Sequence, residues 1–404
     1  MPIEINIPGS KSILNRVLIL AALCEKPIKI ENAIFCEDTE AMIQGLKKLG
    51  HEIKTTNTEI YLTGKIKSQK KEIKIFTNNA GTTTRFLTAL STLKNQNIKI
   101  EGNQRMNSRP IQLLVNALNE IGANVTSINN CPPVQISPSN PTGGKIKIPG
   151  NISSQYISAL MMIAPFTKNG LEIAIENEIY STPYIKMTAS IMQNFGLKST
   201  IDENKITIKG QQKPTPPSSY TVEADASSAS YFGAISALTK KEIKLNITEK
   251  SLQGDIEFLN YLKKMGCKIN KNTITREGEL KSLGEIDMNK TPDLVMTFAV
   301  LAMFTPGKTT ITNISNLKIK ETDRIEALKN EIAKFGIKVE TGEDFIEITG
   351  NPELEIPEIE IETYEDHRIA MAFGILPNVK IKNPSCVNKS FPSYWQELKK
   401  IKNV

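Results

Sequence analysis

Apolar and polar residues follow a pattern along this chain that recurs about every 70 residues. Amphipathic stretches such as GLKKLG, ALNEIG and YLKKMG end in a glycine and lead directly into a short alternating stretch. A glycine at this place is typical of a helix that ends in a left-handed residue before the chain turns into a strand. These glycines are Gly50, Gly122, Gly196, Gly266 and Gly336, with separations of 72, 74, 70 and 70 residues.

A second series of positions marks the starts of apolar helices. Its members are Lys11, Gly81, Ser153, Ser227, Asp293 and His367, separated by 70, 72, 74, 66 and 74 residues. The stretches that follow (ILNRVLILAAL, YISALMMIAPF, LVMTFAVLAMF) predict helices that are buried nearly all round, with their polar residues at one end. Six copies of one strand–helix–strand–helix–strand–strand unit therefore account for the whole chain.

The sixth copy is incomplete at its end. Its second predicted helix, PSYWQELKKI, is followed by neither a glycine nor a strand, whereas the chain begins with an isolated predicted strand, EINIP. We expect this first strand to complete the last copy. The predicted domains are then 10–222, with three repeats, and 1–9 together with 223–404, with the other three.

Basic residues gather at or beside the predicted helix starts. A helix start carries unpaired N–H groups and about half a positive charge, so it attracts phosphate or carboxylate. At any single start, Ser and Thr are also explained as ordinary helix caps. Capping does not explain the cations at the same places: Lys11, Arg16, Arg85, Arg109, Arg324 and Arg368. The pattern predicts a small ligand with several negative charges.

Composition narrows the class of protein. The 404 residues suffice for two or three domains, and no run of 18 apolar residues predicts a membrane span. The start MPIEINIPGSKS already belongs to the repeat, so we expect no signal or transit peptide. The five cysteines show no CxxC spacing and indicate reduced thiols in a cytoplasmic protein. His51 follows a capping glycine and is expected at the surface.

The net charge of +7 does not by itself indicate nucleic-acid binding. Lysines are scattered singly and mixed with glutamates, and no basic block is interleaved with aromatic residues. With only two histidines in the chain, a His-rich metal site is excluded. The expected partners are therefore small anionic substrates, with no nucleic acid, membrane, metal or cofactor.

Two segments near the N terminus carry candidate binding residues. PGSKSILNR places Lys11 and Ser12 at a helix start and Arg16 one turn further on, where three donors would hold a phosphate or carboxylate. NNAGTTTR at 78–85 contains a phosphate-compatible glycine, Gly81, but lacks the Gly-Lys-Ser/Thr of a P-loop. In RMNSRP, Arg109 precedes Pro110, which we expect to start a helix.

The strongest local signal is NLKIKETDR at 316–324. Lys320, Glu321 and Arg324 crowd a predicted helix start, and the two cations stand at i and i+4, where they repel each other without an anion between them. TPD at 291–293 places a single carboxylate, Asp293, at the start of an apolar helix. A carboxylate amid so much positive charge is a candidate general base.

Taken together, these segments resemble the EPSP synthase (3-phosphoshikimate 1-carboxyvinyltransferase) family. The match runs in order from PGSKS-x-x-NR through NAGT-x-x-R, R-x-x-RP, SSQ, S-x-PY, ASSASY, QGD, D-x-N-x-x-PD and KETDR to DHR-x-AM and K-x-FP, over nearly the entire chain. The resemblance implies an α/β (α+β) fold of two domains, each of three βαβαββ units about a pseudo-threefold axis. It also implies an active site in the interdomain cleft, at the helix N-termini.

The implied reaction transfers the carboxyvinyl group of phosphoenolpyruvate to the 5-hydroxyl of shikimate 3-phosphate and needs no metal. The residues implied to hold shikimate 3-phosphate are Lys11, Ser12, Arg16, Ser153, Ser154, Gln155, Ser181, Asp293, Asn316 and Lys320. Those implied to hold phosphoenolpyruvate are Lys11, Gly81, Arg109, Gln155, Arg324, Arg368 and Lys389, and Asn79 is a further candidate. Asp293, Glu321 and Lys320 are the expected catalytic residues, in a monomeric cytoplasmic enzyme.

Two other functions compete with this one. UDP-N-acetylglucosamine 1-carboxyvinyltransferases share the fold and phosphoenolpyruvate, but usually carry a reactive cysteine in a stretch similar to RCGAP. The corresponding GNQRMNSRPIQ has no cysteine. An inert anion-binding scaffold would have lost Asp293, Glu321 or the arginines, which are all present. Asn78 and Phe86 depart from the family pattern without removing a charged ligand, so they put inhibitor sensitivity in doubt rather than activity.

Overall fold

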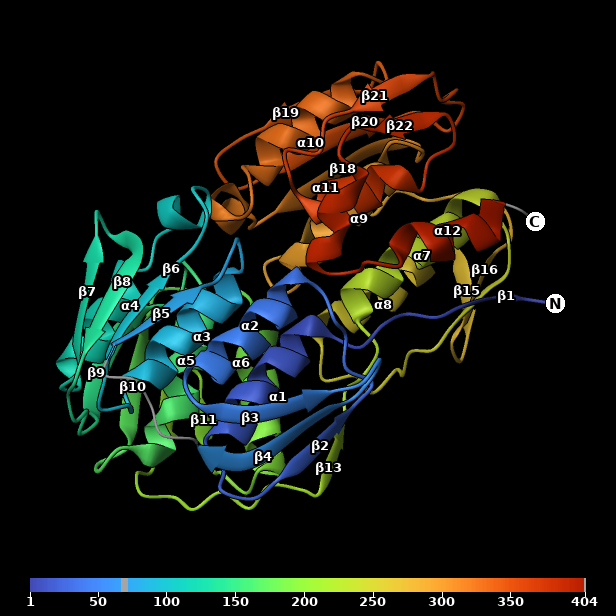
Figure 1. Ribbon diagram of the computed structural model, residues 1–404. Helices are drawn as coiled ribbons and strands as arrows, with labels where there is room; N and C mark the ends of the chain where they lie inside the picture. Colours follow the sequence, from blue (N-terminus) through green and yellow to red (C-terminus); the bar gives the residue numbers. More distant parts are fainter. Residues whose placement is uncertain (67–71, 403–404) are drawn as a thin grey trace. The chain divides into compact units, whose positions relative to one another are not determined.

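The computed structural model describes residues 1–66 and 72–402 of the chain (Figure 1). The chain divides into two compact units, and they are described separately. Unit 1 is Met1–Pro8 together with Glu223–Val404, and unit 2 is Gly9–Val222. Within the described residues, no helix is both long and apolar enough to cross a membrane.

The described residues of unit 2 form three four-stranded sheets and six α-helices. The helices are α1 (Lys11–Ala22), α2 (Glu37–Lys48), α3 (Gly81–Ser91), α4 (Gln112–Glu120), α5 (Ser154–Ile163) and α6 (Thr182–Asn194). The first sheet has the order β13 (Ser219–Thr221), β2 (Ile28–Glu31), β4 (Ile60–Ile66), β3 (His51–Thr55). The second is β5 (Glu72–Phe76), β6 (Asn97–Glu101), β8 (Cys131–Ser137), β7 (Asn124–Ile128), and the third is β11 (Thr200–Asp202), β12 (Lys205–Ile208), β10 (Leu171–Glu176), β9 (Gly144–Pro149).

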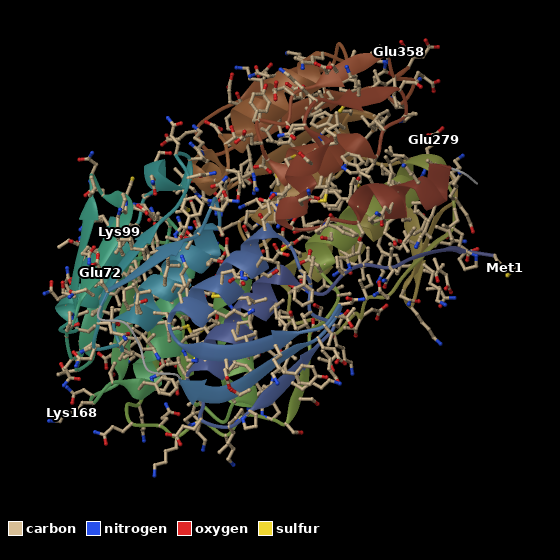
Figure 2. All side chains as sticks on the ribbon, in the orientation of Figure 1. Met1, Glu72, Lys99, Lys168, Glu279 and Glu358 are labelled. Atoms are coloured by element: carbon tan, nitrogen blue, oxygen red, sulfur yellow. The ribbon has the colours of Figure 1, made fainter. Side chains whose placement is uncertain are left out.

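The three sheets of unit 2 share one pairing scheme. Each has one parallel pair, β13 with β2, β5 with β6 or β9 with β10, and two antiparallel pairs. Helices α1, α3 and α5 are buried along almost their whole length, and α3 packs against both of the others. The labelled charged side chains Glu72, Lys99 and Lys168 lie at the periphery of this unit (Figure 2).

The described residues of unit 1 form six further α-helices, two four-stranded sheets and one two-stranded sheet. They are α7 (Ala226–Thr239), α8 (Phe258–Lys264), α9 (Val295–Ala302), α10 (Arg324–Ala333), α11 (His367–Gly374) and α12 (Tyr394–Lys402). One sheet has the order β1 (Ile3–Ile5), β14 (Ile243–Leu245), β16 (Thr273–Arg276), β15 (Cys267–Asn270), and another β17 (Glu285–Asp287), β18 (Gly307–Thr312), β20 (Ile346–Gly350), β19 (Lys338–Thr341). The third consists of β21 (Ile359–Ile361) and β22 (Val379–Ile381).

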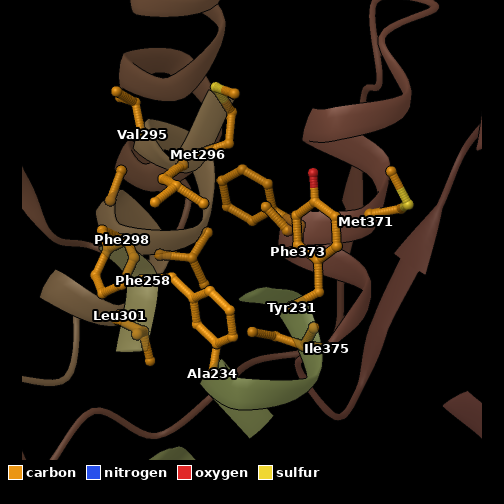
Figure 3. Close-up of a cluster of buried hydrophobic side chains, with 14 of the residues drawn as sticks. Tyr231, Ala234, Phe258, Val295, Met296, Phe298, Leu301, Met371, Phe373 and Ile375 are labelled. Carbon is orange, nitrogen blue, oxygen red and sulfur yellow. The ribbon is translucent and has the colours of Figure 1, made fainter. Parts of the chain in front are cut away.

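The core of unit 1 lies between the apolar helices α7, α9 and α11. Figure 3 shows Tyr231 of α7, Phe298 of α9 and Phe373 of α11 within one cluster of buried side chains. Their relative exposures are 0, 1 and 0%. These helices are mostly apolar, and the charged residues Asp225, Asp293 and Arg368 lie at or just before their starts, where the candidate site residues lie.

The predicted 70-residue repeat is confirmed by backbone geometry. Gly50, Gly122, Gly196, Gly266 and Gly336 all have positive φ, between 73° and 98°, and each lies two or three residues after the last residue of an amphipathic helix. An L-residue with a side chain is strained at positive φ, so glycine is favoured at these positions. The predicted helix starts lie within two residues of the observed ones, and at Asp293 a short 3₁₀ turn, Pro292–Leu294, precedes α9.

The predicted pairing of the N-terminal strand with the sixth repeat is wrong. β1 does not join the sixth repeat; it pairs in parallel with β14 of the fourth, through Ile3 with Ile243 and Ile5 with Leu245. The reason is that β13, which precedes α7 by four residues, pairs with β2 and leaves that edge of β14 open. The N-terminal segment still contacts the last helix, since Asn6 N donates to Glu397 Oε2 at 3.1 Å.

The surface position expected for His51 is also wrong. His51 begins β3, in which the first and third residues are buried, and its own exposure is 4%. The capping glycine turns the chain directly into the sheet, so the next side chain already faces the interior. Burial lowers the pKa of His51 to about 4, and the charge of Lys94 acts in the same direction.

Candidate functional site

The start of α1 holds the first candidate cation, Lys11. Its Nζ lies 2.8 Å from Oδ2 of Asp38, and both side chains are largely buried. Asp38 belongs to the first turn of α2, where a carboxylate is favoured by the helix dipole. The ion pair therefore holds Lys11 between the starts of α1 and α2.

Arg16 lies deeper than the sequence indicates. It is 1% exposed, and its guanidinium donates to Thr188 Oγ1 (2.7 Å), Ser12 O (2.9 Å) and Ser158 Oγ (3.2 Å). Burial lowers its pKa to about 10, which leaves it charged at neutral pH. Arg16 is thus a buried cation whose hydrogen bonds connect α1 to α5 and α6.

Gly81 begins α3 directly beneath two guanidinium groups. A Cβ added at Gly81 would lie 2.7 Å from Nη1 of Arg85 and 3.0 Å from both Cζ and Nη1 of Arg109. Only a hydrogen atom fits in that space, so the glycine lets two arginines approach a helix N-terminus. Arg109 precedes α4 by three residues, and Pro110 does not start that helix as expected; α4 begins at Gln112.

The start of α5 is linked to the same arginine pair. Ser153 caps the helix by accepting from Gln155 N at 3.3 Å, and Gln155 Oε1 accepts from Arg85 Nη1 at 2.7 Å. Arg109 Nη1 donates to the carbonyl oxygen of Asn79 at 3.5 Å. Two further candidates, Ser154 at the start of α5 and Ser181 at the start of α6, are each 5% exposed.

In unit 1, Arg324 is the centre of a cluster of carboxylates. Its Nε donates to Asp366 Oδ2 (2.7 Å), its Nη1 to Asp293 Oδ1 (3.1 Å) and its Nη2 to Glu321 Oε2 (3.0 Å). The arginine is 1% exposed. Burial alone would lower its pKa, but the three carboxylates outweigh burial and raise it above the ordinary arginine value.

Arg368 lies in the first turn of α11, a second helix that contributes to this cluster. Its Nη2 donates to Asp293 Oδ2 at 2.7 Å and its Nη1 to Tyr231 Oη at 3.4 Å. Asp366 caps α11 by accepting from Arg368 N at 2.8 Å, so this one carboxylate orients both arginines. Asp293 therefore lies between Arg324 and Arg368, with its side chain 20% exposed.

The other candidates of unit 1 lie around Glu321. Lys389 Nζ is 3.8 Å from Glu321 Oε1, and both side chains are at most 10% exposed. Lys320 directly precedes Glu321 and is half-buried, and Asn316, in the 3₁₀ turn Ser315–Ile319, is 5% exposed. Within unit 1 the structure thus brings Asp293, Glu321, both arginines and Lys389 into one charged network.

Sequence reasoning missed three members of these networks. Asp38 was not singled out, although its position in an acidic first turn opposite a basic helix start is a readable signal. Asp366 lies in the EDHR segment but was not assigned a role, and Tyr231 lies in ASSASY. Among the described residues, no group of three or more His, Cys, Asp or Glu side chains could hold a metal ion.

The fold places cations and carboxylates together at helix starts, an arrangement that suits the binding of small, multiply charged anions and the transfer of protons. The profile of the family described as EPSP synthase (3-phosphoshikimate 1-carboxyvinyltransferase) matches residues 2–398. The chain belongs to this family.

Individual relatives agree with the family assignment. A 3-phosphoshikimate 1-carboxyvinyltransferase of Buchnera aphidicola subsp. Cinara cedri is 42% identical over 414 aligned residues, which cover 98% of this chain and 94% of that protein. One of Actinobacillus pleuropneumoniae serotype 5b is 41% identical, covering 98% and 96%. A solved EPSP synthase structure from Acinetobacter baumannii has 22% identity and a TM-score of 0.80, and covers 98% of this chain and 94% of that chain. The last comparison shows that the fold is shared.

Proposed function

We propose that this protein transfers the carboxyvinyl group of phosphoenolpyruvate to the 5-hydroxyl of shikimate 3-phosphate, giving 5-enolpyruvylshikimate 3-phosphate and phosphate. The observation that carries the proposal is the family match over residues 2–398, joined to the network of Asp293, Arg324 and Arg368. The reaction belongs to the shikimate pathway and to aromatic amino-acid biosynthesis.

The proposal assigns the two substrates to residues of each unit. Shikimate 3-phosphate is held in unit 2 by Lys11, Ser12, Arg16, Ser153, Ser154, Gln155 and Ser181, and in unit 1 by Asp293, Asn316 and Lys320. Phosphoenolpyruvate is held by Lys11, Gly81, Arg109 and Gln155 of unit 2 and by Arg324, Arg368 and Lys389 of unit 1. Arginine forks match the geometry of carboxylate and phosphate, which supports the second assignment.

The chemistry is an addition followed by an elimination. The 5-hydroxyl oxygen attacks C2 of the enolpyruvate and gives up its proton to Asp293, while Glu321 protonates the methylene carbon, which becomes a methyl group. The resulting ketal phosphate then returns a methyl proton to Glu321, which restores the vinyl group, and phosphate leaves with the proton that Asp293 had taken. Lys320 supports either proton transfer. General acid–base catalysis requires each of these side chains to lie within hydrogen-bonding distance of the atom whose proton it transfers.

Asp293 can act as a base only if its arginines find another partner. In the structure, Asp293 Oδ1 accepts from Arg324 and Asp293 Oδ2 accepts from Arg368. The carboxylate of phosphoenolpyruvate offers the same pair of acceptors. We therefore assign the carboxylate of phosphoenolpyruvate to these two guanidinium groups, so that its binding releases Asp293 to act as the base.

The organisation around this site is part of the proposal. The domains are 10–222 and 1–9 together with 223–404, and the two compact units support that division. The enzyme is a cytoplasmic monomer that needs no cofactor, metal, nucleic acid or membrane. The five cysteines are free thiols, which supports a reducing compartment.

The proposal is tested by phosphate release from phosphoenolpyruvate with two alternative acceptors. Release that depends on shikimate 3-phosphate supports the assignment. Release with UDP-N-acetylglucosamine instead would assign the other carboxyvinyltransferase, and binding of both anions without any release would indicate an inert scaffold. Asp293→Asn, run in parallel, shows that the phosphate comes from this site rather than from a contaminating phosphatase.

A further inference from the structure

Asp255 is a buried carboxyl group that the proposed reaction does not use. It lies in the QGD segment, in the 3₁₀ turn Gly254–Glu257 that packs against α7, and is 2% exposed. Its Oδ2 accepts a hydrogen bond from Ser227 Oγ at the start of α7. Its Oδ1 is fully buried and accepts no hydrogen bond from any residue that the structure describes. An ionised carboxylate with one unsatisfied buried oxygen is costly, whereas a neutral carboxyl is much less so.

The charged groups around Asp255 are those of the candidate site. Asp293 at the start of α9, Arg368 at the start of α11 and Asp225, the cap of α7, all act on its charge, and Tyr261 of α8 faces it as well. Burial raises the pKa of Asp255 to about 7; the charge of Asp293 acts with burial, and Arg368 and the Ser227 hydroxyl act against it. Protonation of this carboxyl therefore changes near neutral pH.

Arg368 connects Asp255 to the substrate. It is the cation that acts on Asp255, and it also holds Asp293 at 2.7 Å. If a substrate carboxylate takes over Arg368, another negative charge enters the same buried network. Like charges in one site cannot all remain ionised, so a proton on Asp255 becomes more favourable once the anion binds. Proton binding and anion binding then strengthen each other by the same factor.

We propose that Asp255 is a positioning residue that carries a proton when the anionic substrate lies on Arg368, and that its ionisation at higher pH weakens the binding of that substrate. The inference rests on the proposed function, because it takes phosphoenolpyruvate as the anion. Asp255 acts through Arg368 and touches no reacting atom. The proton comes from solvent, and no bond of the substrate changes at this residue.

The test compares the KM for phosphoenolpyruvate between pH 7 and pH 9, at saturating shikimate 3-phosphate, in four proteins. Asp255→Asn fixes the neutral state and keeps an acceptor for Ser227. Ser227→Ala removes the hydrogen bond that favours the ionised form. Asp202→Asn removes an exposed carboxylate in unit 2 and serves as the matched control. Because the substrate's own ionisation is common to all four, the ratio of KM values between proteins isolates Asp255.

The expected results differ for each variant. For a group that titrates near pH 7, one-proton linkage raises the wild-type KM relative to that of Asp255→Asn by at most about 50-fold between pH 7 and pH 9. Ser227→Ala moves the rise to higher pH, and Asp202→Asn follows the wild type. The same pH dependence in wild type and Asp255→Asn would overturn the inference. So would an unchanged midpoint in Ser227→Ala, which keeps the test valid if Asp255→Asn does not fold.

A second readout needs no turnover. In protein labelled with ¹³C at aspartate carboxyl carbons, the Asp255 signal is assigned by its absence from Asp255→Asn. We expect it to titrate near pH 7 without ligand and at higher pH with both substrates bound. An Asp255 signal already ionised at pH 5 would overturn the inference. Failure of the wild type to release phosphate at any pH would instead count against the proposed function, so the two outcomes are distinguishable.

Discussion

Nη2 of Arg368 lies 2.7 Å from Oδ2 of Asp293, and Nη1 of Arg324 lies 3.1 Å from Oδ1 of the same carboxylate. The two arginines approach from the starts of α11 and α10, so the carboxylate joins two of the three later repeats. An incoming anion must compete with Asp293 for these guanidinium groups. Asp293 is thus the candidate base and also binds the two guanidinium groups that are proposed to hold the substrate carboxylate.

Replacing Asp293 by Asn is expected to separate these two roles. Asn keeps the size of the side chain and an acceptor but cannot take a proton, so turnover should fall by about 10²–10⁴-fold. Anion binding should become equal or tighter, because the arginines lose a competing charge. The dissociation constant of the anion and the single-turnover rate, measured on the same variant, show whether Asp293 acts as the base. A single-turnover rate within about tenfold of wild type would leave the base role to Lys320 or Glu321.

Arg109→Ala and Arg368→Ala test the division of substrates. Each should weaken phosphoenolpyruvate binding by about 1.5–3 kcal/mol, the value of a charge-assisted contact, and affect shikimate 3-phosphate bound alone much less. Titration calorimetry with each ligand gives both numbers. Lys168→Ala removes a positive charge at an exposed position of unit 2 and serves as the matched control. Equal losses for both ligands would show that the assigned subsites are wrong.

Gly81→Ala tests the close approach of two arginines to α3. The added Cβ would stand 2.7–3.0 Å from the ends of Arg85 and Arg109, and these flexible side chains must move away. We expect the KM for phosphoenolpyruvate to rise by about tenfold or more, about 1.4 kcal/mol, with little change in the melting temperature. An unchanged KM would mean that the guanidinium positions are not set by this glycine.

His51 is expected to make stability depend on pH. Its pKa is about 4 in the folded protein and about 6.5 in an unfolded chain, so the unfolded state binds the proton more readily. Stability is therefore complete above pH 6.5 and is lost as the pH falls toward 4, by up to about 3 kcal/mol. His51→Phe should remove this part of the acid sensitivity in denaturant titrations at pH 7 and pH 4.5. An equal loss in wild type and variant would contradict it.

The sequence predicts the repeat because the signals are local. A positive-φ glycine after an amphipathic helix is recognised from its neighbours, and the five observed φ values confirm the prediction. The partner of β1 was not predictable in this way, because it depends on β13 leaving the edge of β14 for β2, a contact between distant segments. Within the site, the sequence indicates the cations together with Asp293 and Glu321, but not the carboxylates of Asp38 and Asp366.

Asp38 and Asp366 show why these partners were missed. Each is an acidic residue at a helix start, which is ordinary capping when read alone. Only the structure shows that Asp38 faces Lys11 and that Asp366 holds Arg324. Their importance lies in pairing over 27 and 42 residues of sequence, and no local pattern reports such a pairing.

The most direct test of the account is to follow the complete reaction by ¹H and ³¹P NMR in D₂O. Phosphoenolpyruvate and shikimate 3-phosphate should disappear together, with one phosphate released for each vinyl ether formed at the 5-hydroxyl. Deuterium should enter the vinyl methylene of the product, because the intermediate carries a methyl group before it loses phosphate. Phosphate release without a vinyl ether on shikimate 3-phosphate, or a product methylene that takes up no deuterium, would contradict the account.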